Sequence, residues 1–345
     1  MQPQKEVEPN NFLWYLLMKK LVVTAALSLF CFLAFSQEAD EPGRGNAEFS
    51  VVARGEYLHT DPLGNSSLYT LLDGYITEKL SYSVSNHWLS SDPLSLYANS
   101  LHSDSPTWLD WAYINYETEH FIISAGKMVS LWGTYENDEY DYDIHYPFAS
   151  SVWNNLTSYQ WGVSAGWMPW CEGTIIEASF MSSPYGVRPF EEGLFNAGLR
   201  VRSESDSMGA IIAYNVFNRP DAPLLGVLSS GVRFQVSPSF SFVWDNTYKV
   251  CDPDALFMDG NSSNLNFTYS GIEKMELLAN FGSDHYSQED ITSYRCGFAL
   301  HYYPVEDLRI HALVSGMRPY AGAGTEVLFS LGLTYKFSTT WRVKM

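Results

Sequence analysis

The stretch Val327-Leu-Phe-Ser-Leu-Gly-Leu-Thr-Tyr-Lys-Phe337, close to the C-terminus, alternates side chains of two kinds. One face takes the large apolar members, which are Val327, Phe329, Leu331, Leu333, Tyr335 and Phe337. The other face takes Leu328, Ser330, Gly332, Thr334 and Lys336. Because successive side chains of a β-strand point to opposite faces, a period of two residues predicts an extended strand with one apolar face.

The same alternation recurs along the chain and predicts sixteen strands. They lie at 47–58, 68–78, 81–90, 108–117, 120–129, 158–168, 173–182, 193–203, 208–217, 227–236, 239–249, 263–272, 275–284, 292–302, 307–317 and 325–337. Each is close to the roughly ten residues with which a tilted strand crosses a membrane. The pattern is weakest over 68–90, which leaves fourteen or eighteen strands open.

The connectors between these segments alternate in length. Short turns such as 79–80 alternate with longer polar loops such as 218–226. This asymmetry is typical of bacterial transmembrane barrels, which have short periplasmic turns and long extracellular loops. A β-sandwich would bury the apolar faces against a second sheet, whereas a barrel exposes them to lipid. The sequence therefore predicts an all-β fold in which 47–345 forms one transmembrane antiparallel β-barrel. The apolar face of 327–337 then points outward, and Lys336 points into the lumen.

The N-terminal segment has the features of an export signal. A basic start at 18–20 precedes an apolar run at 21–35, and small residues at 34–36 offer a cleavage site. The apolar run is too short for a membrane-spanning helix. The sequence thus predicts an over-extended N-terminus at 1–17, a signal peptide at 18–36 and a short periplasmic segment at 37–46.

Composition narrows the class of partner. The chain has 20 Lys and Arg residues against 39 Asp and Glu residues, a formal net charge of −19. Nucleic acid and anionic lipid surfaces are therefore poor partners. The 23 Tyr, 20 Phe and 11 Trp residues suit the aromatic girdles of a transmembrane barrel.

The longest predicted loop, 130–157, is the third of the long loops. It follows a strand–turn–strand segment formed by 110–117 (DWAYINYE) and 121–127 (FIISAGK). This layout resembles the bacterial porins, general and phosphate-selective, whose sixteen-stranded barrels fold the third extracellular loop into the lumen. The resemblance implies an outer-membrane protein that lets small hydrophilic solutes diffuse passively, without a cofactor and without enzymatic activity. It also implies contact with outer-membrane lipid, with lipopolysaccharide or its equivalent and with the barrel assembly machinery, and it leaves a homotrimer open.

Five carboxylates cluster within this loop, at Glu136, Asp138, Glu139, Asp141 and Asp143. Three interpretations stay open. The cluster could belong to a solvated outer loop, it could line a pore constriction that attracts cations, or its oxygen atoms could hold Ca²⁺. The second interpretation predicts a modest cation preference.

Basic residues gather on the predicted lumen faces of the strands, at Arg54, Arg200, Arg202, Arg233, Arg295, Arg309 and Lys336. They could form a basic wall opposite the acidic loop, with a transverse field that screens solutes by charge. They could equally pair with interior carboxylates such as Glu48, Glu56 and Asp245. The scarcity of lysine among them argues against a phosphate-specific pore.

No motif predicts catalysis or a metal site. The segment 162–166 (GVSAG) matches the Gly-x-Ser-x-Gly nucleophile elbow, but it lies inside a predicted strand, and the elbow needs a strand-to-helix turn. The eight histidines have no metal-ligand spacing, although His301 and His311 are expected to face the lumen on neighbouring strands. The alternatives left open are an outer-membrane hydrolase of the omptin or phospholipase type, a non-conducting adhesin barrel and a carbohydrate-preferring porin.

Overall fold

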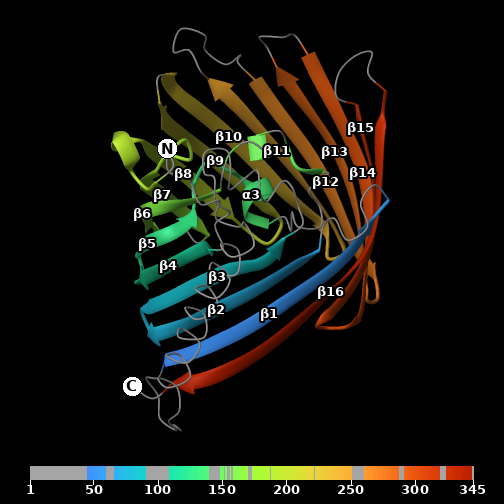
Figure 1. Cartoon of the computed structure of the whole chain (residues 1–345), viewed down its shortest axis with the longest axis horizontal. Coiled ribbons are helices and arrows are strands. Elements are labelled where there is room, and N and C mark those ends of the chain that lie inside the picture. Colours follow the sequence, from blue (N-terminus) through green and yellow to red (C-terminus); the bar gives the residue numbers. More distant parts are fainter. Residues whose placement is uncertain are drawn as a thin grey trace, which may run out of the picture.

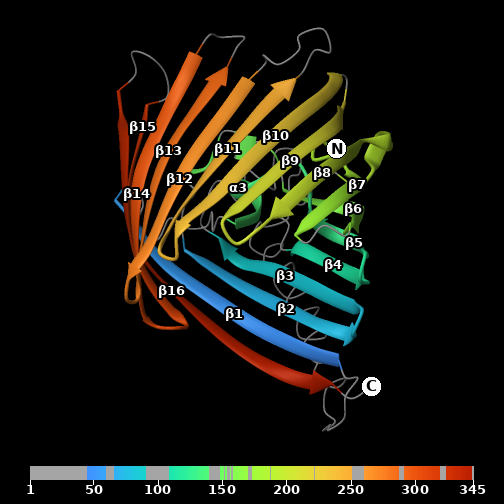
Figure 2. The same cartoon turned by 180° about the vertical axis from the view of Figure 1, so that it is seen from behind.

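The chain forms a closed barrel of antiparallel strands (Figures 1 and 2). This computed structural model describes residues 45–59, 66–90, 109–139, 148–150, 152–153, 156, 158–169, 173–186, 188–220, 222–250, 260–286, 291–318 and 324–343. The predicted N-terminal extension and signal peptide, together with 37–44 of the predicted periplasmic segment, lie outside the described residues. Strands that follow one another in the chain are neighbours in the sheet, and β1 pairs with β16 to close it.

The sixteen strands of the structure agree with the sixteen predicted ones in number and place. Their bounds are β1 Gly45–Leu58, β2 Ser67–Thr77, β3 Leu80–Ser90, β4 Leu109–Glu117, β5 Phe121–Val129, β6 Tyr159–Trp167, β7 Thr174–Ser182, β8 Phe195–Glu204, β9 Met208–Arg219, β10 Ala222–Ser237, β11 Phe240–Val250, β12 Gly260–Ile272, β13 Met275–Tyr286, β14 Ile291–Val305, β15 Leu308–Arg318 and β16 Glu326–Val343. Two short helices, α3 Tyr135–Glu139 and η2 Glu191–Gly193, lie in connectors. No helix among the described residues is long and apolar enough to cross a membrane.

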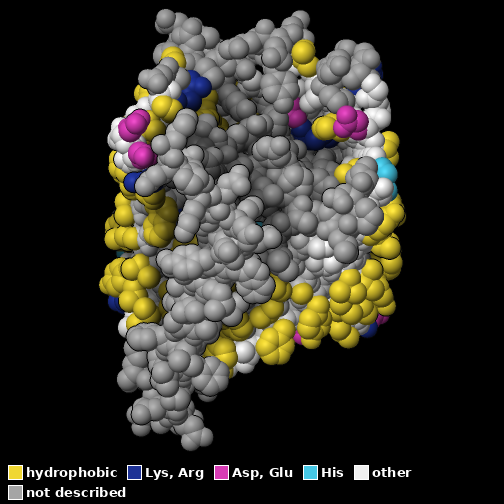
Figure 3. Space-filling model, in the orientation of Figure 1, with side chains coloured by type: hydrophobic (Ala, Val, Ile, Leu, Met, Phe, Trp, Pro, Cys, Tyr) yellow, Lys and Arg dark blue, Asp and Glu magenta, His cyan; other side chains and the backbone are white. Residues whose placement is uncertain are grey.

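The two faces of each strand meet different surroundings, as β16 illustrates. The side chain of Phe329 is 44% exposed on the outside, whereas the next residue, Ser330, is 1% exposed. Lys336 lies on the inward face, with Nζ 3.8 Å from Glu48. Figure 3 shows apolar side chains gathered on the outer flanks of the barrel. The predicted register of 327–337 is confirmed, and a slip by one residue would have inverted every side chain.

The last strand is longer than the sequence pattern predicts. β16 continues past residue 337 to Val343, because these residues pair with the first half of β1. At the outer surface the rings of Phe49 and Trp341 stack with centroids 6.3 Å apart. The extension therefore completes the closure of the barrel, which a local pattern does not reveal.

One predicted loop is wrong. The sequence predicts a long loop at 218–226, but β9 runs to Arg219 and β10 begins at Ala222. The Arg219 guanidinium donates to the carbonyl oxygen of Pro223 at 2.8 and 3.0 Å, and the pairing register shifts between Ala222 and Leu225. Proline interrupts the alternation of the sequence, yet it is tolerated at a strand start or a bulge.

Candidate functional site

The described part of the loop 130–157 lies inside the barrel, against the inner wall of β8–β13 (Figure 1). The carbonyl oxygen of Leu131 accepts a hydrogen bond from Asn215 Nδ2 of β9 at 2.8 Å. The next carbonyl oxygen, of Trp132, accepts one from Ser229 Oγ of β10 at 2.7 Å. The structure thus places the described residues of this loop in the lumen, as the sequence predicts.

A carboxylate on β11 caps the short helix α3. Thr134 Oγ1 donates a hydrogen bond to Asp245, and the backbone N–H groups of Tyr135 and Glu136 bond the same carboxylate. A helix N-terminus presents unpaired N–H donors and partial positive charge, which a carboxylate satisfies. Asp245 lies 111 residues beyond Thr134 in the chain, so this cap fixes the loop to the wall.

Glycines on the inner wall make room for the loop. A Cβ added to Gly231 of β10 would lie 2.9 Å from Thr134 Cβ, and one added to Gly297 of β14 would collide with the ring of Phe148. The loop therefore rests almost on the backbone of these strands. The sequence analysis identified neither these glycines nor the cap by Asp245. Glycine at inward-facing strand positions was the signal for the close approach of the loop, and the sequence carried no comparable signal for the cap.

Tyr135 lies close to two guanidinium groups. Its hydroxyl donates to Glu204 Oε1 at 2.7 Å, and the guanidinium carbons of Arg202 and Arg233 lie 5.9 and 5.3 Å from its ring centroid. Arg233 and Arg202 also donate to Glu204, at 2.6 and 3.1 Å. Burial and the hydrogen bond to Glu204 raise the pKa of the Tyr135 phenol, so it remains a neutral donor at physiological pH. Gly209, on β9, leaves the space that the hydroxyl occupies.

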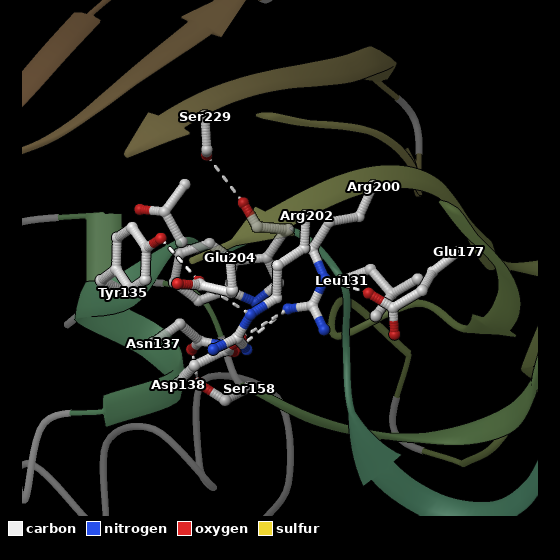
Figure 4. A network of polar contacts seen from close by, with 12 residues as sticks. Leu131, Tyr135, Asn137, Asp138, Ser158, Glu177, Arg200, Arg202, Glu204 and Ser229 are labelled. Atoms are coloured by element: carbon white, nitrogen blue, oxygen red, sulfur yellow. Dashed lines mark hydrogen bonds and ion pairs between the residues drawn. The ribbon is translucent and has the colours of Figure 1, made fainter. Parts of the chain in front are cut away.

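Asp138 joins α3 to β8, as Figure 4 shows. Its carboxylate accepts hydrogen bonds from Arg200 Nη1 at 2.9 Å and from Arg202 Nη1 at 3.2 Å. Arg200 Nε in turn donates to Glu177 of β7 at 2.6 Å. The acid of the loop and the bases of the wall therefore neutralise each other in direct contact here, rather than facing each other across open lumen.

Glu136 anchors a second part of the loop, around Phe148 and Ser150. Its Oε1 accepts from the backbone N–H of Ser150 at 2.6 Å and from Asn264 Nδ2 of β12 at 3.2 Å. The same Nδ2 lies 3.0 Å from the carbonyl oxygen of Phe148. Glu136 and Asp138 thus connect α3 to opposite sides of its docking site.

The rest of the predicted acidic cluster is only partly visible. Glu139 ends α3, and Asp141 and Asp143 lie outside the described residues. Within the part of the chain that the structure describes, no three His, Cys, Asp or Glu side chains are arranged to hold a metal ion. The described residues therefore give no support to the third interpretation of the cluster, a Ca²⁺ site.

The other predicted basic residues line β1 and β14–β16. Arg54 lies 3.8 Å from Glu56, and Arg295 bonds Asp284. Arg309 lies on β15, two positions from His311. An ion pair with a carboxylate, which the pairing interpretation expects, is seen at Arg54, Arg200, Arg202, Arg233, Arg295 and Lys336.

His301 and His311 both face the lumen on neighbouring strands, as expected. They lie opposite each other on β14 and β15, with ring centroids 6.4 Å apart. His301 Nδ1 lies 3.2 Å from Glu276, and His311 Nε2 lies 3.7 Å from Glu56 across β16. Gly332 leaves the space that the His311 ring crosses.

Ser164 has the surroundings of a strand residue. It lies in the middle of β6, is paired with Ser124 on one side and Ser179 on the other, and its Oγ donates to Met128 Sδ at 3.6 Å. The strand-to-helix turn that a nucleophile elbow requires is therefore missing at this position.

Comparison with known proteins identifies the fold. No family model matches the chain, and no curated protein matches it. An anion-selective porin from Comamonas acidovorans has a TM-score of 0.60 at 9% identity, covering 85% of this chain and all of that one. OmpT, an outer membrane protein of Vibrio cholerae, has a TM-score of 0.59 at 13% identity, covering 88% of this chain and all of that one. A variant of the Rh. blastica porin has a TM-score of 0.56 at 11% identity, covering 85% of this chain and 99% of that one. The chain therefore has the fold of the bacterial porins.

Proposed function

We propose that this protein is a porin of a bacterial outer membrane through which small hydrophilic solutes diffuse passively. One observation carries the proposal: a closed sixteen-stranded barrel holds a fixed loop segment inside its lumen. A barrel of this strand number encloses an aqueous passage, and a docked loop narrows it without a hinge or a cofactor. The apolar outer faces of the strands fit lipid as the surrounding solvent.

We propose further that the passage prefers cations modestly. Among the described residues of the inner wall and the docked loop taken together, carboxylates outnumber basic groups. Those on the wall include Glu48, Glu56, Asp73, Asp110, Glu177, Glu204, Asp245, Glu276 and Asp284. Glu136 and Asp138 add two more, although both also serve to anchor the loop. An excess of negative charge beside a low-dielectric wall raises the local cation concentration. The name of the Comamonas porin gives the opposite selectivity, so the sign rests on this chain's own charges.

Planar bilayers test both parts of the proposal. The purified barrel should give stepwise conductance, and the reversal potential in a KCl gradient should show a small cation preference. Neutralising Glu139, Asp141 and Asp143 to the amides should lower that preference without releasing the anchors made by Glu136 and Asp138. Higher salt should weaken the preference, because the Debye length falls to about 10 Å at 0.1 M and to about 3 Å at 1 M. Absence of conductance would contradict the porin proposal, and an anion preference would contradict the charge argument.

The competing functions predict different outcomes in the same apparatus. A non-conducting adhesin barrel gives no current steps, and a hydrolase of the omptin or phospholipase type gives substrate turnover. The position of Ser164 in mid-strand offers no support for a nucleophile elbow. Our proposal is therefore a non-enzymatic pore, with outer-membrane lipid, lipopolysaccharide or its equivalent and the assembly machinery as partners. Assembly into a homotrimer stays a prediction.

A further inference from the structure

The connector between β7 and β8, residues 183–194, contacts both the inside and the outside of the barrel. In Figure 1 it is the yellow-green segment near β7 and β8 at the outer edge of the barrel. Its first part packs inside, where the Tyr185 side chain lies against an apolar cluster that joins the docked loop to the wall. The cluster consists of Trp132, Val152 and Leu156 of the loop and Phe217, Leu225 and Val227 of β9 and β10. Tyr185 therefore adds to the contacts that hold the loop 130–157 in the lumen.

The second part of the connector lies on the outer surface. The Phe190 ring stacks on the Phe180 ring of β7, with centroids 5.8 Å apart and an interplanar angle of 17°. Phe180 is 50% exposed and pairs with the outward Val163. Phe195 of β8 stacks on the same ring, with centroids 5.6 Å apart. Because Phe180 faces outward, Phe190 lies outside the barrel, whereas Tyr185 of the same connector packs against the inner cluster.

The backbone around Phe190 has a conformation that directs its ring toward β7. Phe190 and Glu192 have φ angles of 58° and 54°, in the left-handed region that bulky side chains rarely adopt. Hydrogen bonds within the turn hold this conformation. The Arg188 backbone N–H donates to Glu191 Oε2 at 3.1 Å, and the Gly193 N–H donates to the carbonyl oxygen of Phe190 at 3.1 Å. The stacked position of Phe190 thus accompanies a costly backbone, which indicates a built contact.

The apolar surface that Phe190 joins continues around the barrel. Outward side chains that are about half exposed occur on strands far apart in the sheet, among them Phe121, Ile123, Leu199, Ile212 and Phe281. A second protein would cover one side of such a belt, whereas the hydrocarbon of a bilayer covers all of it. Beside Phe190 the charged Arg188 and Glu192 are exposed. An aromatic ring next to exposed charges fits the boundary between acyl chains and lipid headgroups.

We propose that the connector 183–194 is a clip across the rim of the barrel. Its outer end, Phe190, inserts among the acyl chains of the outer leaflet, and its inner end, Tyr185, braces the docked loop. The inner part of the proposal rests on the porin function above. Ser183 fixes the base of the clip, since its Oγ donates to the carbonyl oxygen of Asn218 at 2.6 Å and its N–H to that of Leu194 at 3.3 Å. The two rings then hold the rest of the connector over the rim, so lipid outside the barrel steadies the constriction inside it.

Spin labels test the outer end of the clip. Cys171, Cys251 and Cys296 are replaced by serine, and a nitroxide is attached through Phe190→Cys or, as the control, through Glu192→Cys. In vesicles of dioleoyl phosphatidylcholine, oxygen concentrates in the hydrocarbon, and a neutral nickel chelate stays in water. We expect oxygen to relax the label at position 190 more than nickel does, and the reverse order at position 192. Equal nickel access at both positions would overturn the lipid contact. Exclusion of both reagents with spin–spin broadening would assign the site to a second copy and also overturn it.

Single-channel noise tests the inner end. Phe190→Ser and Tyr185→Ala should each raise the open-channel noise, because each releases one end of the clip. Phe190→Leu keeps an apolar side chain and should remain as quiet as the parent. The matched control is Glu192→Gln, in the same turn, which should leave the noise unchanged. The double variant of Phe190→Ser with Tyr185→Ala should be no noisier than the noisier single variant, since both act through one element. Additive noise would overturn the coupling between the two ends.

The outcomes separate the two proposals. If the parent does not conduct, the porin function is overturned, and the labels at positions 190 and 192 still decide whether the connector contacts lipid. If the parent conducts and Phe190→Ser is as quiet as the parent, the clip is overturned and the porin function stands. Should Phe190→Cys fail to fold, the difference in noise between Phe190→Leu and Phe190→Ser decides, and equal noise in these two variants would overturn the clip.

Discussion

Two sectors of one inner wall use polar side chains in opposite ways. On β8–β13, Asp245, Glu204 and Asn264 direct their polar atoms at the loop, and Arg200 and Arg202 are neutralised by Asp138. On β2–β4, Trp111 and Tyr69 face the lumen, and Tyr69 Oη has no hydrogen-bond partner among the described residues. The first sector therefore positions the constriction, whereas Trp111 and His87 of the second sector bond Ser83 and Asp110 within the wall itself.

The contacts between the loop and the wall also change the electric field that is expected in the lumen. A basic wall facing an acidic loop across the lumen would leave both sets of charges free. Instead, the arginines next to α3 touch its carboxylate, and such contacts reduce the long-range field to that of an ion pair. Selectivity should then follow the excess of carboxylates over basic groups in the whole lumen rather than a transverse dipole.

The largest effect is expected from a variant that tests the strand register, which places both sectors of the wall on the inner side of the barrel. Val163→Arg puts a charge on the outer face at the middle of β6, where Val163 is 51% exposed. We expect a loss of about 2–4 kcal/mol in folding free energy, the cost of Arg at the bilayer midplane. Ser164→Arg, one residue along, faces the lumen and should cost less while lowering conductance. Refolding into lipid vesicles measures both variants, and the reverse ranking would show that the sectors face lipid.

The next test removes the space for the loop. Gly231→Leu should displace Thr134 and cost about 1–3 kcal/mol through overpacking. We expect the loop to leave the wall, with larger and noisier single-channel currents. The control is Gly55→Leu, because a Cβ at Gly55 has no neighbour within 4 Å and Gly55 faces outward. Unchanged currents in Gly231→Leu would mean that α3 does not dock on β10.

A milder change removes the helix cap alone. Asp245→Ala leaves the Thr134 hydroxyl and two backbone N–H groups of α3 without their acceptor, at a cost of about 1 kcal/mol. The current noise should rise moderately, with little change in the folding midpoint of the barrel. Asp73→Ala, which removes an inward carboxylate from β2, serves as the control and should leave the noise unchanged. Equal noise in both variants would contradict a special role for Asp245.

The fold was predictable because lipid and water enforce opposite chemistry on alternate residues, as in 327–337. The position at which the loop docks was not predictable, because it depends on contacts between residues that are far apart in the chain, such as Thr134 and Asp245. Whether two such residues come into contact depends on how far each strand is shifted relative to its neighbours around the barrel. A two-residue period does not encode this shift. The short connection between β9 and β10, for which the sequence predicts a loop at 218–226, was missed for a local reason. Pro220 and Pro223 interrupt the alternation, although the strands continue on either side of them.

Disulfide trapping of the loop on the wall tests the central claim most directly. With Cys171, Cys251 and Cys296 replaced by serine, Thr134→Cys and Gly231→Cys are combined in one chain. Their Cβ atoms would lie 2.9 Å apart, so a small shift reaches the disulfide range of about 3.5–4.5 Å. The Ser50→Cys/Ser338→Cys pair, directly opposite on β1 and β16, controls for oxidation. We predict that the Thr134/Gly231 pair cross-links quantitatively in the folded barrel and that the cross-linked protein still conducts. A control pair that cross-links while the Thr134/Gly231 pair stays reduced would contradict a loop docked inside the lumen.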